Sequence, residues 1–138
     1  MTAAAVIVDT NIVVAALLTH NAASPVARML DGMLAATFPF VLSEALLAEY
    51  RRVLIRPALR KLHGLTVVEV ETVLTDIAQH AILLIPISGT PAPDPGDQLL
   101  WDLLALRDDL VLVTGDKLLL QNLPMKGRVL TALEFCAM

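Results

Sequence analysis

Val6-Ile7-Val8-Asp9-Thr10-Asn11 is the stretch that decides the fold. Three β-branched residues are followed at once by three polar turn residues, and an apolar run then continues from Ile12 to Leu18. Short β-branched runs bounded by turn residues are typical of strands, and longer apolar runs are typical of buried helices. The stretch therefore predicts a buried strand, a sharp turn and a buried helix, with Asp9 at the carboxyl end of the strand.

The same arrangement recurs later, where Leu110-Val111-Leu112-Val113 is followed by Thr114-Gly115-Asp116. Further short strands are predicted at 40–42, 82–85 and 129–130. Helical patterns lie between the strands, at 25–36, 43–56, 66–81, 99–106 and 117–121, and Pro57 is expected to end the second of them. Aliphatic strands that alternate with helices indicate an α/β fold, a three-layer α/β/α sandwich with a mostly parallel central sheet.

Length and composition restrict the class of protein. A chain of 138 residues has the size of one domain, predicted to span 1–138, and its 57% hydrophobic residues exclude intrinsic disorder. No membrane span is expected, because Asp9-Thr10-Asn11 interrupts the richest apolar stretch. The first basic residue is Arg28 and Cys136 has no partner for a disulfide, which favours a cytoplasmic protein over a secreted one.

Acidic residues are expected to gather at one edge of this sheet. Asp9 and Asp116 each follow a strand, and the carboxyl ends of parallel strands meet at a single edge, where ligands bind. Asp94 and Asp97 flank the start of the helix near 99. Glu49 lies on the flank of the apolar face of helix 43–56, from which it can reach the same edge.

Converging carboxylates need a counter-charge, because two of them repel by about 4 kcal/mol at 4 Å under an effective dielectric near 20. Mg²⁺ and Mn²⁺ prefer oxygen ligands and suit a site of Asp and Glu alone. Such an ion activates water for phosphodiester cleavage, and the pattern leaves one or two ions open. Each acid taken singly is also explained by an ordinary turn or helix cap.

The net charge of −4 opposes binding of nucleic acid by the molecule as a whole, so any such binding must be local. Five of the ten cations lie within eleven positions: Arg51, Arg52, Arg56, Arg60 and Lys61. This run is a candidate phosphate-binding patch, although a run of this kind is more often a solvated helix face.

The sequence resembles the PIN-domain nucleases over almost its whole length. The resemblance rests on the order and spacing of four segments: residues 6–11, Leu47-x-Glu49-Tyr50, Asp94-Pro95-Gly96-Asp97 and Leu112-Val113-Thr114-Gly115-Asp116-Lys117. It is greatest to the bacterial branch of toxins from toxin–antitoxin pairs, related to the VapC-type toxins. The resemblance implies a doubly wound α/β/α sandwich with an acidic pocket that binds Mg²⁺ or Mn²⁺ and cleaves RNA.

Carried over by position, the resemblance implies four metal-binding and catalytic acids and four polar neighbours. The acids are Asp9, Glu49, Asp97 and Asp116, and the neighbours are Thr10, Asn11, Ser43 and Thr114. Gly96 stands where relatives usually carry a charged residue, so either Asp94 or Asp97 could be the ligand. The resemblance also implies a homodimer and an antitoxin protein that covers the site.

These features lead to the hypothesis of a metal-dependent endoribonuclease in which Arg52 or Arg56 holds a phosphate of the RNA substrate. Two alternatives stay open. One is a housekeeping RNA-processing nuclease with the same chemistry. The other is a non-catalytic PIN-like module that binds a protein partner and retains its acids as helix caps and surface charge.

Overall fold

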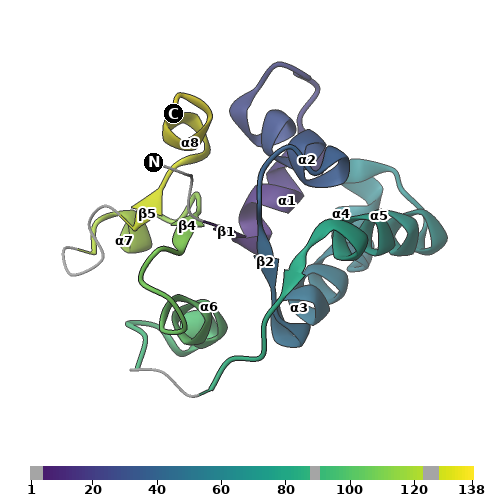
Figure 1. Ribbon diagram of the computed structural model, residues 1–138. Coiled ribbons are helices and arrows are strands. Elements are labelled where there is room, and N and C mark those ends of the chain that lie inside the picture. The colour runs from purple at the N-terminus through teal and green to yellow at the C-terminus, as the bar shows by residue number, and fades with distance from the viewer. Residues whose placement is uncertain (1–4, 88–90, 123–127) are drawn as a thin grey trace.

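The computed structural model describes residues 5–87, 91–122 and 128–138, which form an α/β sandwich (Figure 1). The strands are β1 (Val6–Val8), β2 (Val41–Leu42), β3 (Ile82–Leu83), β4 (Val111–Val113) and β5 (Val129–Leu130). The helices are α1 (Thr10–Leu18), α2 (Pro25–Ala35), α3 (Glu44–Leu54), α4 (Pro57–His63), α5 (Val67–His80), the 3₁₀ turn η1 (Pro95–Asp97), α6 (Gln98–Leu104), α7 (Lys117–Leu120) and α8 (Ala132–Cys136). None of the helices in these ranges has the length and apolar character needed to cross a membrane.

All paired strands run parallel, in two short sheets of order β1-β4-β5 and β2-β3. A single parallel bridge between Val6 and Phe40 joins them, and the Val6 amide donates to the Pro39 carbonyl at 3.1 Å. The combined order is therefore β3-β2-β1-β4-β5. From β1 the chain adds β2 and β3 on one side of that strand, and later adds β4 and β5 on its other side. The strand order therefore reverses between β1 and β4, and α/β folds bind ligands at such a topological switch point.

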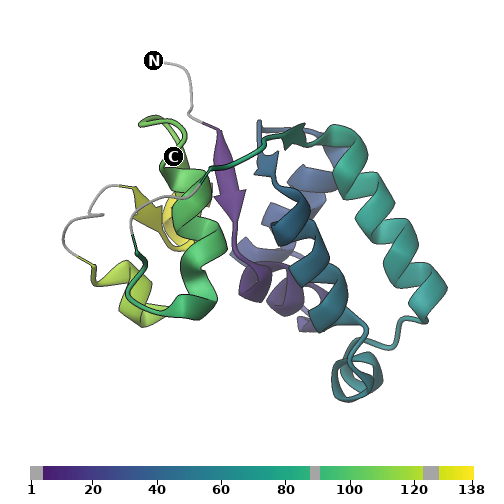
Figure 2. The ribbon, with the colours of Figure 1, turned by 90° about the horizontal axis from the view of Figure 1, so that it is seen from below.

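Helices cover both faces of the strands. In Figure 1, α6 lies on one side of β1, β4 and β5, and α8 lies on the other, and the turned view in Figure 2 agrees. The interior between them is aliphatic, with Tyr50, Phe40 and Trp101 as its large aromatic members. The sandwich expected from the sequence is confirmed.

Figure 2 also shows how the helices meet at the carboxyl end of β1. This strand runs directly into α1, and α7 and the first turn of α6 lie at the same lower end of the view. Segments far apart in sequence therefore meet at one edge of the sheet.

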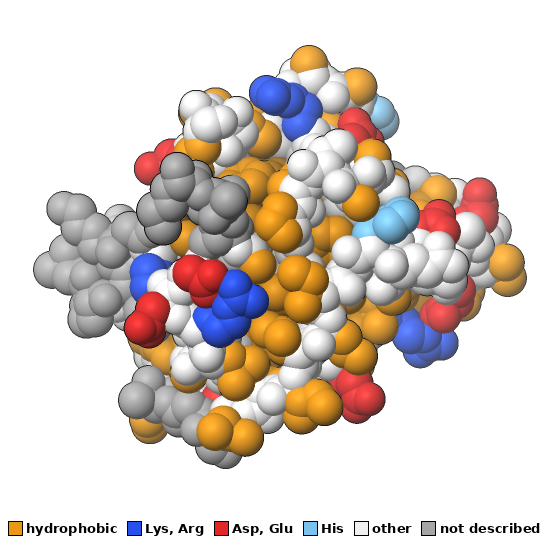
Figure 3. Space-filling model, viewed as in Figure 1, with side chains coloured by type: hydrophobic (Ala, Val, Ile, Leu, Met, Phe, Trp, Pro, Cys, Tyr) orange, Lys and Arg blue, Asp and Glu red, His pale blue; other side chains and the backbone are white. Residues whose placement is uncertain are grey.

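Two elements differ from the sequence expectation. The strand expected at 82–85 is shorter, and as the edge strand β3 exposes its side chains, 40% for Ile82 and 62% for Leu83. Figure 3, in the orientation of Figure 1, shows hydrophobic side chains gathered over this part of the molecule. Pro57 does not merely end a helix but begins α4, because a proline at the first helical position sacrifices no hydrogen bond.

Helix α8 was not predicted, although a capping box marks its start. The Thr131 side chain accepts from the Glu134 amide, and the Glu134 carboxylate accepts from the Thr131 amide. At five residues, the helix is too short to show a periodic apolar face. Segment 86–95, whose four prolines and one glycine predict an ordered loop, lies partly outside the described residues.

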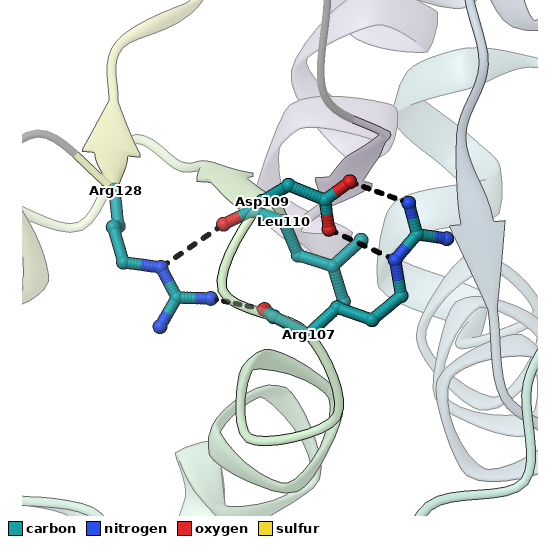
Figure 4. Close-up of polar contacts among 4 residues, drawn as sticks. All are labelled: Arg107, Asp109, Leu110 and Arg128. Atoms are coloured by element: carbon teal, nitrogen blue, oxygen red, sulfur yellow. Dashed lines mark hydrogen bonds and ion pairs between the residues drawn. The ribbon is translucent and has the colours of Figure 1, made fainter.

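Arg128 clamps the opposite, amino-terminal edge of the strands. Its guanidinium donates to the carbonyls of Leu110 at 3.2 Å, Leu104 at 2.9 Å and Arg107 at 2.7 Å. Figure 4 shows Arg128 beside the ion pair of Arg107 with Asp109. Arg128 thus joins the end of α6 to the start of β4. Asp97 lies just before the other end of α6, and Asp116 lies just after the other end of β4.

Replacing Arg128 by Lys should lower the free energy of unfolding by about 1–3 kcal/mol, because a single ammonium group cannot reach three carbonyls. Urea unfolding followed by circular dichroism measures the change. The Arg107→Gln variant is the control, and it should change little because its ion pair is fully exposed and screened. Equal effects of the two substitutions would contradict the clamp.

Candidate active site

A pocket of about 450 Å³ opens at the switch point between β1 and β4, and acids from four separate elements line it. Asp9 follows β1, Glu49 lies on α3, Asp97 precedes α6 and Asp116 follows β4. The rest of the wall consists of Thr10, Asn11, Val14, Ala15, Leu18 and Val53. The expected gathering of acids at one edge of the sheet is therefore present.

Asp9 is the most buried of these acids, with 8% of its surface exposed. Its Oδ2 accepts a hydrogen bond from the Thr114 hydroxyl at 2.7 Å and a longer one from Asn11 Nδ2 at 3.4 Å. Burial raises the pKa of Asp9 to about 6, and the negative charges of Glu49 and Asp97 add to the rise. The Asp9 side chain makes no cap bond to α1, so helix capping does not explain its position.

The Thr114 hydroxyl joins the turn after β4 to the turn after β1. Besides donating to Asp9, its oxygen accepts from the Asp116 amide at 3.0 Å and from Asn11 Nδ2 at 3.3 Å. One donated and two accepted bonds use the full capacity of a hydroxyl group. Asn11 Oδ1 completes the connection by accepting from the Gly115 amide at 3.0 Å.

Glu49 is held in the pocket from α1. The Thr10 hydroxyl donates to Glu49 Oε2 at 2.9 Å, while Arg52 lies 3.9 Å from Oε1. The next residue, Tyr50, is fully buried and its hydroxyl donates to the carbonyl of Val8, the last residue of β1. Tyr50 thus anchors α3 to the strand that ends at Asp9. In the sequence, Tyr50 falls on the apolar face of helix 43–56, which predicts burial but not this hydrogen bond. The signal for it is that the hydroxyl of a buried tyrosine usually needs a hydrogen-bond partner.

Asp97 and Asp116 both line the pocket, and their negative charges repel each other. Partial burial raises the pKa of the Asp97 carboxyl, and the negative charges of Asp116, Asp94 and Glu49 raise it further. Asp97 makes no side-chain cap bond to α6, whereas Asp116 Oδ1 accepts from the Leu118 amide at 2.9 Å and caps α7.

The structure also separates the two alternatives at the Asp94-Pro95-Gly96-Asp97 segment. Asp94 Oδ1 accepts from the Gly96 amide at 2.8 Å, which is ordinary turn chemistry, and Asp94 is not among the residues that line the pocket. Asp97 does line it. The geometry thus favours Asp97 over Asp94 as a site residue.

Besides Asp94 and Thr114, three expected residues do not line the pocket. Ser43 is buried and caps α3 by accepting from the Leu46 amide at 3.1 Å, so its role is structural. Arg52 lies at the rim beside Glu49, and Arg56 is exposed at the start of α4.

A larger hollow of about 720 Å³ lies elsewhere, between α2 and α8. Its ionisable side chains are Arg28, Asp31 and Cys136, beside aromatic and aliphatic residues. It lacks the converging carboxylates that hydrolytic metal chemistry uses, so the smaller acidic pocket is the stronger candidate for an active site.

The chemistry of the acidic pocket suits a hard divalent cation, because every ionisable group in its wall is a carboxylate. Neighbouring negative charges also raise the pKa values of Asp9 and Asp97, and a cation would offset this repulsion. Within the described ranges, no three His, Cys, Asp or Glu side chains already stand close enough to hold an ion. The donor types fit such an ion, and the carboxylates would have to turn toward one another to ligate it.

Replacing Tyr50 by Phe should lower the free energy of unfolding by about 1–3 kcal/mol, because the buried Val8 carbonyl loses its Tyr50 hydrogen bond. Thermal and chemical denaturation measure this loss. An unchanged stability would show that the Tyr50 hydroxyl does not hold α3 to β1.

Asp9 should make the metal-free protein less stable as the pH rises from about 4 to about 7. Its folded-state pKa near 6 exceeds the ordinary value of 3.8, so the folded protein holds this proton more tightly and loses that advantage as the pH passes 6. The loss is about 3 kcal/mol at most. In EDTA, Asp9→Asn should gain stability relative to wild type across this range, whereas parallel pH profiles of the two proteins would exclude the effect.

Comparisons with known proteins agree with this geometry. A family model described as PIN domain matches residues 5–118, which include all four acids of the pocket. No individual curated protein matches the sequence significantly. PIN domains are generally nucleases and typically bind divalent metal ions. Because the match covers most of the chain, this protein belongs to the PIN-domain family.

Proposed function

We propose that this protein is an Mg²⁺- or Mn²⁺-dependent endoribonuclease and the toxin of a toxin–antitoxin pair. One observation carries the catalytic part: carboxylates from four separate elements meet in one pocket at the switch point of the sheet. Separate turns or helix caps would not require this convergence, and neither Asp9 nor Asp97 makes the side-chain bond of a helix cap.

In this proposal Asp9, Glu49, Asp97 and Asp116 hold the metal. A divalent ion at this place would supply an activated water and offset the charge of the phosphate. The chain's own groups keep the carboxylates oriented: Thr114 and Asn11 hold Asp9, and Thr10 holds Glu49. The Thr114 hydrogen bond offsets part of the rise in the pKa of Asp9 that burial causes.

Arg52 is suited to hold a substrate phosphate at the rim. Its side chain is 62% exposed and its long contact with Glu49, at 3.9 Å, is easily exchanged for a phosphate oxygen. Arg56 follows one turn further along the chain and is also exposed. Both arginines are expected to affect substrate binding more than the cleavage step.

The purified chain should cleave fluorescently labelled single-stranded RNA in Mn²⁺ and not in EDTA. Asp9→Asn and Asp116→Asn should each reduce cleavage by more than about 100-fold, since even substitutions outside the ligand shell of a metal site cost 10–100-fold. Glu44→Gln is the matched control, because Glu44 lies on α3 outside the pocket and its loss should leave the rate unchanged.

The alternatives give different results in the same preparations. A non-catalytic interaction module would release no heat with Mn²⁺ in calorimetry and would not be stabilised by the metal. A housekeeping nuclease would cleave RNA but would not arrest growth when its expression is induced. The toxin role also predicts a cytoplasmic homodimer and an antitoxin protein that relieves the arrest, and Asp9→Asn should not arrest growth.

A further inference from the structure

The positive charge of the chain is concentrated beside the acidic pocket. From Tyr50 to Val68 the sequence holds five Lys and Arg residues and not one Asp or Glu. On α3, Arg51 pairs with Glu71 at 2.5 Å and Arg52 lies near Glu49. The other three cations belong to α4: Arg56 is its N-cap residue, and Arg60 and Lys61 lie within the helix.

These three cations are not neutralised within the described part of the chain, where none of them has an ion pair. The Nε of Arg60 is shielded from solvent and has no hydrogen-bond partner there. Elsewhere in the described part of the chain, Arg107 is paired with Asp109 and Arg128 donates to three carbonyls. Arg28 and Lys117 have no ion pair there, but each stands apart from other cations in the sequence. A cluster of uncompensated cations on a protein of net charge −4 points to an anionic ligand.

Helix α4 is held firmly in place despite its seven residues. Pro57 begins it, and Gly64 ends it in the left-handed conformation with φ 75°. His63 fastens its end, because Nε2 contacts the Leu54 carbonyl at 2.9 Å and Nδ1 accepts from the Leu65 amide at 3.0 Å. The cations therefore stand on a positioned element.

The fold sets this element next to the pocket. Helix α4 packs on α1 and α3, the helices that supply Leu18 and Val53 to the pocket wall. In Figure 2, α4 projects at the lower edge of the view beyond the end of α3, at the same end as α7 and the first turn of α6. A strand of nucleic acid that crosses the pocket would therefore meet α4.

A hollow of about 280 Å³ lies between α4 and the start of α5, lined by Arg60, Lys61, Pro57, Gly64, Leu65 and Thr66. The capping box at the start of α5 uses the Thr66 and Glu69 amides. The cationic groups that line this hollow are the Arg60 and Lys61 side chains, so an anion in it would be held by these two residues.

We propose that α4 is a phosphate-binding arm that extends the RNA site beyond the acidic pocket, with Arg60 and Lys61 contacting backbone phosphates away from the cleaved bond. This inference rests on the proposed function. The cations of the arm would attract RNA phosphates beside the acidic pocket, whose carboxylates repel them. Because it contacts phosphates and not bases, it adds affinity without sequence preference.

The test measures binding of a short fluorescein-labelled single-stranded RNA by anisotropy in EDTA, between about 50 and about 200 mM NaCl. The double variant Arg60→Gln with Lys61→Gln should bind about five- to tenfold more weakly. The slope of log affinity against log salt should fall by about 1.4, or about 0.7 for each lost contact with a single strand.

Two further double variants make the result specific. Arg28→Gln with Arg107→Gln removes the same charge from α2 and from the loop after α6, and it should leave the affinity and the slope unchanged. Arg60→Lys with Lys61→Arg keeps the charge and should restore binding. Circular dichroism confirms that each variant folds.

The outcomes separate this inference from the proposed function. RNA binding that depends on α4, without cleavage in Mn²⁺, would support the arm and defeat the nuclease. Cleavage with equal binding by both Gln double variants would support the nuclease and overturn the arm. Absence of RNA binding by the wild type in EDTA would also overturn it, and would leave an acidic protein as the ligand of α4.

Discussion

The parallel pairing of β1 with β4 is the contact on which the acidic pocket depends. Val8 pairs with Val113, and the Asp9 amide donates to the Val113 carbonyl at 2.9 Å, so the residues that follow the two strands emerge side by side. This register brings the Thr114 hydroxyl to 2.7 Å from the Asp9 carboxylate. A slip by one residue would turn the side chains of one strand to the opposite face and take the pocket apart.

The pocket stores unfavourable electrostatic energy in an otherwise aliphatic fold. Burial raises the pKa values of Asp9 and Asp97, and the negative charges of neighbouring carboxylates raise them further. Hydrogen bonds from Thr114, Asn11 and Thr10 offset part of this cost and hold the carboxylates facing the pocket. A site maintained against such a cost is typical of functional groups, because stability alone would favour apolar residues there.

Charge is separated along the molecule in a way that matches the proposed substrate. The acids converge at the switch point, and the free cations stand on α4 beside it. An RNA backbone would first be attracted by the cations of α4 and would then reach the carboxylates of the pocket. Under the proposed function, entry of the scissile phosphate into the pocket would depend on a metal ion held by the carboxylates, which would couple binding at the cleaved bond to metal binding.

The sequence alone determined the elements that local patterns encode: the strand–turn–helix at Asp9, the strand that ends before Thr114, and the helical angle that sets Glu49 on the flank of α3. Each follows from apolar periodicity and from polar residues at strand ends, which need no distant partner. Only the tertiary structure decided that Asp97 rather than Asp94 lines the pocket and that Tyr50 reaches Val8. It also decided that β3 is an exposed edge and that Arg60 Nε has no hydrogen-bond partner among the described residues. These outcomes depend on which residues distant in sequence lie within hydrogen-bonding reach, and that information exists only once the strands have paired.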